Sequence, residues 1–391
     1  MTFKASLRGQ VPPFIVMDVM RDAAALEAQG RSIIHLEVGQ PSTGMPQVAA
    51  QRISALIGRD KLGYTVADGI APLRERIARY YGDTYAVDVD PARIFVTTGS
   101  SAAFTLSFLA AFDVGDKVVV AAPGYPSYRH ILGAYGINVE LVPVDASTRF
   151  NISVDHLKKM ARPPKGVIVA SPANPTGSMI EPGVFRDLVN YCHDNHIRMI
   201  SDELYHGITF GIDSVTALDA STSAIVINSF SKFFSMTGWR LGWMVVPDDL
   251  YRSVECLAQN LYISPPALAQ HAALAAFDCM DELTANVGVY ARNRETLLKR
   301  LPEIGFPTFS PPDGAFYFYI KVAHLGMGSP EVCRRILHEA GVAVTPGLDF
   351  DPFHGREWLR LSYAVSEAEI AQACERLGAW MKTAQSQIKT A

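Results

Sequence analysis

One lysine, Lys232, lies among serines and aromatic residues in the segment NSFSKFFSMTGWRLGW (228–243), and Arg240 follows it by eight positions. A lysine that folding removes from water has a lowered pKa, and its amine can then form a Schiff base with a carbonyl group. The hydroxyl groups of Ser229, Ser231 and Ser235 and the guanidinium of Arg240 would suit a phosphate held close to that amine. A lone lysine is more often simply solvated, so other segments must decide between the two interpretations.

Two serines at the start of a helix could form a second wall of the same anion site. In VTTGSSAAFTLSF (96–108) a strand ends, Gly99 permits a tight turn, and Ser100 and Ser101 open a helix. Amides at a helix N-terminus bind phosphate, and the helix dipole favours its negative charge. Serine is also a common helix cap, so this segment predicts a phosphate site only in combination with Arg240.

A carboxylate and a phenol occur together in MISDELYHG (199–207). Asp202 follows an apolar strand, where a carboxylate is costly unless it is paired, and Tyr205 comes three positions later. Such a pair would suit a flat ring with a protonated nitrogen at one edge and an oxygen at another. A helix N-cap at Asp202 explains the segment equally well when it is considered alone.

Three further polar side chains carry less specific signals. SPANPTG (171–177) is a proline-bracketed loop that would hold Asn174 in place, and APGYPSY (122–128) places Tyr125 where it could stack on a ring. Near the C-terminus Arg360 alternates with leucines, so its guanidinium would point away from the apolar face and could bind a carboxylate. A plain turn, a surface aromatic residue and a solvent-facing arginine are the competing interpretations.

Seven short runs rich in Val and Ile would position these side chains. They are apolar at consecutive positions and alternate with helical patterns, as is typical of strands covered by helices on both faces. The runs are residues 93–99, 116–123, 137–144, 166–172, 197–203, 224–230 and 241–247. We therefore expect an α/β fold with a mostly parallel, doubly wound sheet of seven strands. The polar segments follow the carboxyl ends of the strands, where open α/β sheets bind ligands.

The two ends of the chain differ from this middle part. A helical pattern over 14–30 ends at a glycine, and an amphipathic helix begins at Ser366. We expect a large domain over residues 46–285. A smaller α+β domain would be built from both termini, residues 1–45 plus 286–391.

Composition excludes several classes of function. The 391 residues carry a net charge of −4, which gives no basic surface for nucleic acid or anionic lipid. The five cysteines are scattered without metal-ligand or redox spacing, so free thiols in a reducing compartment and no metal site are expected. No signal peptide and no run of about 18 apolar residues is recognisable. These observations predict a soluble cytoplasmic protein.

Together the motifs resemble those of the class I/II aminotransferases, the pyridoxal 5′-phosphate (PLP) enzymes of fold type I in the aspartate aminotransferase superfamily. The matching text, in the family's order, is YTVADGIAPLRERIA, VTTGSSAA, APGYPSY, SPANPTG, SDELYHG, SFSKFFSMTGWRLGW and WLRLSYA. The resemblance spans nearly the whole chain, and the lysine–arginine segment with NPTG upstream is its most specific part.

The resemblance implies PLP as the cofactor and a role for each matching residue. Lys232 would carry the internal aldimine and, once freed, would move the proton between the substrate Cα and cofactor C4′. Asp202 would keep the pyridine nitrogen protonated. The other implied contacts are Tyr205 and Asn174 to the ring oxygen, Tyr125 stacked on the ring, Ser100, Ser101, Ser229 and Arg240 to the phosphate, and Arg360, Asn174 and the Gly39 backbone to the substrate carboxylate.

The resemblance also implies a homodimer with shared active sites, because Tyr64 matches a tyrosine that reaches the phosphate of the neighbouring subunit in the family. Subgroups that prefer dicarboxylates carry a second arginine or a lysine. The two places where it would occur, 104–112 and 265–274, contain neither, although His271 could serve weakly. The segment 11–20, which lies over the substrate side chain in relatives, is apolar.

We therefore expect an aminotransferase that takes a neutral, aliphatic or aromatic L-amino acid and passes its amino group to a 2-oxo acid such as 2-oxoglutarate or pyruvate. An aspartate-preferring enzyme stays open, since relatives can accept dicarboxylates by rearranging loops. A carbon–sulfur β-lyase on the same fold would share the lysine, aspartate and arginine. The effector domain of a transcription regulator is disfavoured, because those chains carry an N-terminal winged-helix segment.

Overall fold

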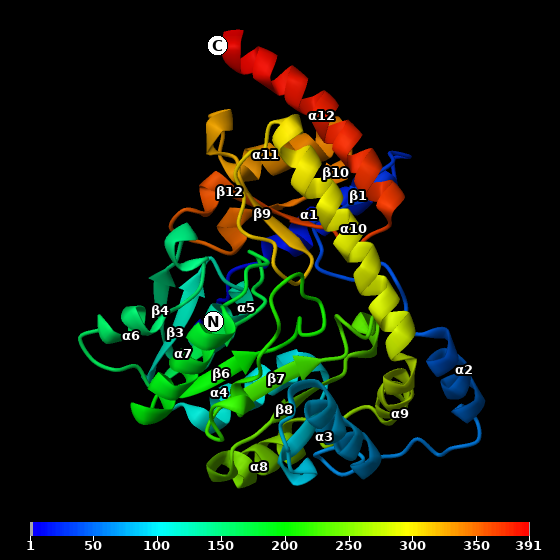
Figure 1. Cartoon of the computed structure of the whole chain (residues 1–391), viewed down its shortest axis with the longest axis vertical. Helices are drawn as coiled ribbons and strands as arrows, with labels where there is room; N and C mark the ends of the chain where they lie inside the picture. The colour runs from blue at the N-terminus through cyan, green and yellow to red at the C-terminus, as the bar shows by residue number, and fades with distance from the viewer. Residues whose placement is uncertain (1–2, 391) are drawn as a thin grey trace.

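The central sheet contains all seven predicted strands. In the computed structural model, which describes residues 3–390, they form one sheet in the order β2-β8-β7-β6-β5-β3-β4 (Figure 1). Only β8 runs antiparallel to its neighbours β7 and β2 among these strands. The mostly parallel seven-stranded α/β sheet is confirmed. The strands are β2 (Ile94–Thr97), β3 (Lys117–Ala122), β4 (Asn138–Pro143), β5 (Gly166–Ala170), β6 (Arg198–Asp202), β7 (Ile225–Ser229) and β8 (Gly242–Val245).

Helices cover both faces of this sheet, which explains why its strands are apolar at consecutive positions. Val118 and Val120 of β3 pack on one face with α4, α5 and α8, whereas Val119 packs on the other face with α3, α6 and α7. The helices are α3 (Ala71–Tyr85), α4 (Gly99–Ala111), α5 (Pro126–Ala134), α6 (Val154–Lys158), α7 (Pro182–Asp194) and α8 (Tyr251–Leu261).

A second group of elements lies against the end of the sheet where the polar segments follow the strands (Figure 1). It holds an antiparallel sheet, β11-β12-β9, and a parallel pair, β1-β10. The strands are β1 (Ile34–His35), β9 (Tyr317–Lys321), β10 (Val342–Ala343), β11 (Thr345–Pro346) and β12 (Trp358–Ser362). The helices are α1 (Ile15–Glu27), α11 (Ser329–Arg335), continued by a π-helical turn (Ile336–Ala340), and α12 (Glu367–Thr390).

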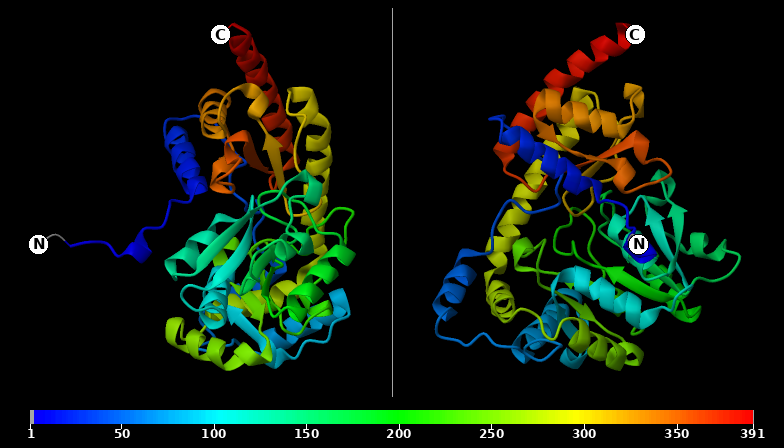
Figure 2. Two further views of the ribbon diagram at one scale, coloured as in Figure 1. Left: turned by 90° about the vertical axis from the view of Figure 1, so that its left-hand side faces the viewer. Right: turned by 180° about the vertical axis from the view of Figure 1, so that it is seen from behind.

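Three helices connect the two groups. The long α10 (Met280–Ile304) runs from one group to the other, and α2 (Gln47–Leu56) and α9 (Ala267–Ala276) lie near its start (Figure 1). On the far side of the second group from α10 lies α1 (Figure 2). Both ends of the chain contribute to this group, since Ile34 of β1 pairs with Val342 of β10. The domain boundaries at residues 46–285 stay a prediction.

Within residues 3–390, none of the helices has both the length and the apolar character needed to cross a membrane. The same part of the chain contains no cluster of three or more His, Cys, Asp or Glu side chains that could hold a metal ion.

Candidate active site

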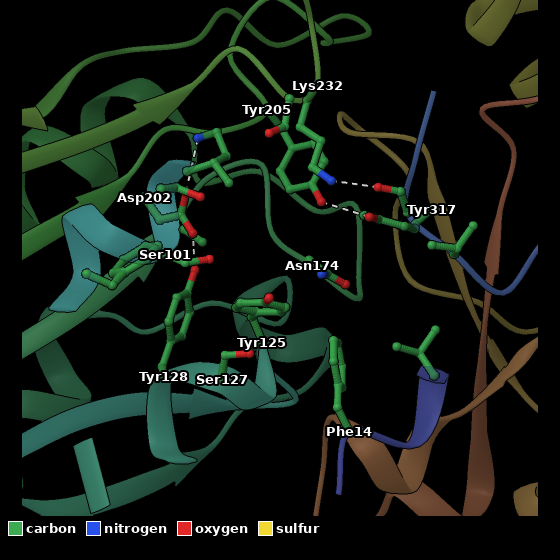
Figure 3. A pocket seen from close by; sticks show the side chains of 18 of the residues that line it. Phe14, Ser101, Tyr125, Ser127, Tyr128, Asn174, Asp202, Tyr205, Lys232 and Tyr317 are labelled. Carbon is green, nitrogen blue, oxygen red and sulfur yellow. Dashed lines mark hydrogen bonds between the residues drawn. The ribbon is translucent and has the colours of Figure 1, made fainter. Parts of the chain in front are cut away.

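A cavity of about 210 Å³ lies between the carboxyl ends of the central strands and the second group (Figure 3). The structure brings most of the predicted site residues to its wall. Those that line it are Gly39, Ser100, Ser101, Tyr125, Asn174, Asp202, Tyr205, Lys232, Arg240 and Arg360. Segments that are far apart in the sequence therefore meet at one place, as the open α/β sheet requires.

Lys232 points its amine into the cavity, where Nζ donates a hydrogen bond to the carbonyl oxygen of Gly39 at 2.6 Å. Burial and, less strongly, the charge of Arg360 lower the pKa of this amine to about 8, while the charge of Asp202 opposes the shift. About a tenth of the amine is therefore neutral at pH 7, far more than for an ordinary lysine, and the neutral form is the one that acts as a nucleophile or base.

Asp202 ends β6 with its carboxylate buried beside the cavity. Its Oδ1 accepts the backbone N–H of Leu204 at 3.1 Å, and its Oδ2 accepts a short hydrogen bond from the Tyr128 hydroxyl (Figure 3). Burial raises the pKa of this carboxyl to about 6, against the effect of these hydrogen bonds and of Lys232. The helix-cap interpretation is wrong, because residues 204–207 form a turn and no helix follows directly.

Tyr205 meets Tyr317 of β9, with the two hydroxyl oxygens 2.7 Å apart (Figure 3). Sequence reasoning missed Tyr317 as a site residue, since it lies in an aromatic strand pattern that indicates only a core. The Tyr317 hydroxyl also explains why position 39 is a glycine. A Cβ atom at position 39 would overlap this hydroxyl group, so only glycine lets the backbone approach here.

A wall of hydrogen-bond donors, suited to an anion, forms at the N-terminus of α4. Ser100 and Ser101 lie in its first turn, and the guanidinium of Arg240 lies beside them along the cavity. Gly99 has a φ of +72°, and a Cβ atom there would come within 2.7 Å of Arg240 Nη2. A glycine is thus required both by the turn and by the arginine. Free amides, hydroxyls and a guanidinium together are the donors that phosphate groups prefer.

Two predicted contacts fall outside the cavity. Ser229, the last residue of β7, is buried and donates its hydroxyl to Ser231 Oγ at 2.9 Å. The structure places Ser231 at the wall instead, because Ser231 follows the strand end and Ser229 lies within the sheet. Tyr64 is 85% exposed and lines a separate surface hollow with Thr98 and Pro265, so it does not reach the cavity of its own chain.

The environment of Arg360 differs from the one that the sequence pattern indicated, although the residue lines the cavity. It is only 2% exposed, because both faces of β12 are covered, so the solvent-facing alternative is wrong. Its Nη1 donates to Asn174 Oδ1 at 2.8 Å, and Nη2 donates a short hydrogen bond to the Glu37 carbonyl oxygen. The guanidinium carbon lies 4.6 Å from the Tyr317 ring centre and 4.7 Å from that of Phe350. Glu37 and Phe350 had no sequence signal for this role.

The remaining wall of the cavity is apolar. It is made by Phe14, Val16, Met17, Phe104 and Ile131. Phe14 lies edge-on to Tyr125, with ring centres 5.9 Å apart. Among the described residues that line the cavity, the only lysine or arginine side chains are those discussed above, and His271 is not part of the lining.

The arrangement thus places an amine of lowered pKa, a buried carboxylate and an anion-binding wall around one space. A second guanidinium and an apolar surface complete it. A profile of the aminotransferase class I and II family matches residues 31–377 of the chain. The chain belongs to this family. The recognition made from the motifs is confirmed, and the protein is a PLP-dependent transaminase, which moves the amino group of an amino acid to a 2-oxo acid.

Relatives of this aminotransferase agree along its whole length. It is 43% identical over 385 residues to the valine–pyruvate aminotransferase of Mycobacterium tuberculosis, covering 97% of this chain and 99% of that protein. The crystal structure of an aminotransferase from the same species superimposes with a TM-score of 0.96 at 42% identity, over 98% of this chain and 100% of the other. The aspartate aminotransferase of Thermotoga maritima gives a TM-score of 0.90 at 29% identity, over 97% and 100%. These comparisons do not favour the carbon–sulfur lyase alternative.

Proposed function

We propose that the cavity binds pyridoxal 5′-phosphate and that the aminotransferase uses a neutral, aliphatic or aromatic L-amino acid as amino donor. The observation that carries the proposal is the spacing of three groups around one cavity: the Lys232 amine, the Asp202 carboxylate and the anion-binding wall at Arg240. An aldehyde, a ring nitrogen and a phosphate on one flat molecule would need such partners. The cofactor, when bound, supplies an electron sink that stabilises negative charge at the substrate α-carbon.

Each residue of the sheet end would hold one part of the cofactor. Asp202 would hold a proton on the ring nitrogen, helped by Tyr128, which keeps its carboxylate oriented. Tyr205 and Asn174 would hold the ring oxygen, and Tyr125 would stack on the ring. The first turn of α4 and Arg240 would bind the phosphate, to which we add Ser231 in place of Ser229.

The Lys232 amine would also move the proton at the substrate α-carbon. Because its pKa is lowered to about 8, the amine can accept a proton near neutral pH and return it within the same turnover. Arg360 would bind the substrate carboxylate. Its Nε is buried and lacks a hydrogen-bond partner among the described residues, so this donor is available for a ligand.

The apolar wall supports a neutral donor. Phe14, Val16 and Phe104 offer no partner for a second carboxylate, and burying a charge against them would be costly. Valine as donor and pyruvate as acceptor fit this wall and agree with the name of the M. tuberculosis relative. 2-Oxoglutarate is the alternative acceptor, and preference for aspartate is the alternative outcome for the donor.

A homodimer with shared active sites is part of the proposal. Tyr64 is strongly exposed, and its hollow includes Thr98, which precedes the first turn of α4. In a dimer Tyr64 would reach the phosphate site of the second copy. Light scattering on the purified protein should give twice the mass of the chain, and Tyr64→Phe should weaken PLP binding. A cytoplasmic location stays a prediction.

The deciding experiment is the absorbance spectrum of the PLP-loaded protein after addition of single amino acids without a 2-oxo acid. Conversion of the bound cofactor to its amine form by valine, alanine, leucine or phenylalanine, and its reversal by pyruvate or 2-oxoglutarate, would support the proposal. Faster conversion by aspartate would overturn the neutral-donor assignment. A persistent aldehyde form with release of pyruvate and ammonia from cysteine-like substrates would point to the lyase. Lys232→Ala is the control.

A further inference from the structure

The carboxylate of Asp349 lies at the N-terminus of α1, although 333 residues separate it from Val16. Its Oδ1 accepts the backbone N–H of Ile15 at 3.2 Å, and its Oδ2 accepts that of Val16 at 3.3 Å. The helix has no cap of its own, since its N-cap residue, Phe14, offers no side-chain hydrogen bond. Asp349 is 2% exposed, so this contact is built into the interior. A negative charge here satisfies first-turn amides and complements the helix dipole.

The capped helix carries much of the apolar wall of the cavity. Phe14, Val16 and Met17 line it, and Phe14 contacts the ring of Tyr125. The helix lies on the outside of the second group, and the residues before it extend away from the body of the molecule (Figure 2). The second half of α1 is anchored by Ala23 and Leu26, which pack with Leu337 and Ala343. The first turn, which carries the residues of the apolar wall, lies outside this cluster, so its position depends on contacts of its own.

The stretch that supplies the cap also contacts the polar side of the site. The Asp349 carbonyl oxygen accepts from Arg129 Nη2 at 2.7 Å, and Arg129 lies on α5 close to Tyr125. The carbonyl oxygen of the next residue, Phe350, accepts the backbone N–H of Gly124 at 3.1 Å. The Phe350 ring lies against Arg360. One short turn thus joins α1, the loop of Tyr125 and the proposed carboxylate-binding arginine.

We propose that Asp349 is a positioning residue, which caps α1 in order to fix Phe14, Val16 and Met17 over the side chain of the amino donor. The inference rests on the proposed function, because it concerns how that donor is held. Without the cap, first-turn amides of α1 lose their partners and the helix leaves its position more often. The donor then binds only the fraction of molecules in which α1 is in place, so its KM rises. The kcat changes little, since Lys232 lies on a different element.

The first test compares Asp349→Ala with Asp349→Asn, using valine as donor. Alanine removes both acceptors, and KM should rise about three- to thirtyfold, with kcat within about twofold of wild type. Asparagine keeps one oxygen acceptor, so the KM of Asp349→Asn should lie between that of wild type and that of Asp349→Ala. Trypsin cleavage after Arg21, an exposed residue of α1, should be faster in the alanine variant and gives a readout that needs no cofactor.

A second variant removes the contact from the other side and leaves the buried carboxylate in place. Ile15→Pro deletes one donor N–H at the first helical position, where proline is well tolerated. Phe14 already has φ −89° and ψ 103°, which is the extended conformation that a residue before proline adopts. Ile15→Ala is the control for the lost side chain. The proline variant should raise KM and tryptic cleavage by more than the alanine variant does.

Asp351→Ala is the matched control for disturbing the turn itself. Asp351 is also buried, but its Oδ1 accepts the N–H of Phe353 within the same turn. The Asp351→Ala variant should leave tryptic cleavage at Arg21 near the wild-type rate.

If Asp349→Ala and Ile15→Pro change neither KM nor cleavage, the inference is overturned. It is also overturned if Asp349→Ala raises KM but lowers kcat and cofactor absorbance as well, because a general disturbance of the turn would do the same. Absence of all transamination by wild type would instead contradict the proposed function, while the cleavage comparison would still test the cap.

Discussion

The two walls of the cavity are built in different ways. The first wall consists of side chains that follow the ends of the central strands, such as Asp202 and Lys232. The second wall comes from the other group of elements, where Arg360 lies within a buried strand and Phe14 precedes a helix capped from far away in the sequence. The first wall carries the groups that we propose to react, at the end of the sheet, and the second carries the groups that we propose to bind the substrate. Changes in the first wall should therefore lower the rate constant, and changes in the second should lower affinity.

The largest effect should come from the first wall. Lys232→Ala removes the proposed nucleophile and base, and kcat should fall by at least about a thousandfold. The protein should stay folded, because within residues 3–390 the side chain makes one hydrogen bond, to the Gly39 carbonyl. Steady-state kinetics and circular dichroism check both points. Lys232→Arg keeps the charge and size and should be almost as inactive, whereas substantial activity in either variant would contradict the assignment.

Sequence reasoning succeeded on the first wall because its signals are local. Runs of Val and Ile indicated buried strands, and polar residues directly after them indicated the ligand-binding edge of the sheet. Asp202 and Lys232 were found in this way. Ser231 lines the cavity and Ser229 does not, which a pattern cannot show because it does not fix where a strand ends. The contact of Ser229 to a phosphate stays a prediction.

The second wall had weaker signals for physical reasons. Tyr317 occurs in an apolar pattern, and its ring does pack in the interior, so only the three-dimensional structure shows what its hydroxyl contacts. Arg360 alternates with leucines as an exposed residue would, but both faces of its strand are covered. The cap of α1 by Asp349 joins residues more than 330 positions apart, and no local pattern can predict such a contact.

The second-largest effect should come from Arg360→Met. A carboxylate then loses its charged partner, and KM for the amino donor should rise about ten- to a hundredfold, with a smaller change in kcat. Arg360→Lys keeps the charge but loses the planar fork that contacts Asn174 and Glu37, and it should lie between Arg360→Met and wild type. Initial rates over a range of valine concentrations separate KM from kcat. A fall in kcat alone would break the division between the two walls.

A smaller effect, on stability, should come from replacing Glu203. This residue follows Asp202 in the sequence, but its side chain does not line the cavity. Its Oε1 accepts from Ser201, Thr216 and the Ala217 N–H, and burial raises its pKa from 4.5 to about 8. A raised carboxyl pKa contributes stability that is present below pH 4.5 and is lost as pH rises through 8.

Glu203→Gln should remove this loss without touching the cavity. At pH 9 the variant should be more stable than wild type by about 1–3 kcal/mol, and at pH 5 the difference should vanish or reverse. Chemical denaturation at the two pH values measures the difference in the free energy of unfolding. The kcat is the control and should not change. A large loss of kcat would mean that Glu203 belongs to the first wall after all.

The smallest effect tests whether the two walls are independent. The charge of Arg360 is the largest cause, after burial, of the lowered pKa of Lys232, so the second wall tunes the nucleophile of the first. Acylation of Lys232, followed by mass spectrometry of the protein without cofactor, should rise with pH and reach a plateau above a midpoint near 8. In Arg360→Met the pKa of Lys232 should rise, because a repelling charge is gone, and labelling at pH 7 should slow about two- to fivefold with the same plateau.

Two variants are controls. Arg360→Lys keeps the charge and should label like wild type. Arg240→Met should shift the midpoint less, since the charge of Arg240 acts more weakly on Lys232. Equal midpoints in Arg360→Met and wild type would show that burial alone sets the reactivity of this lysine, and that the substrate-binding wall has no part in it.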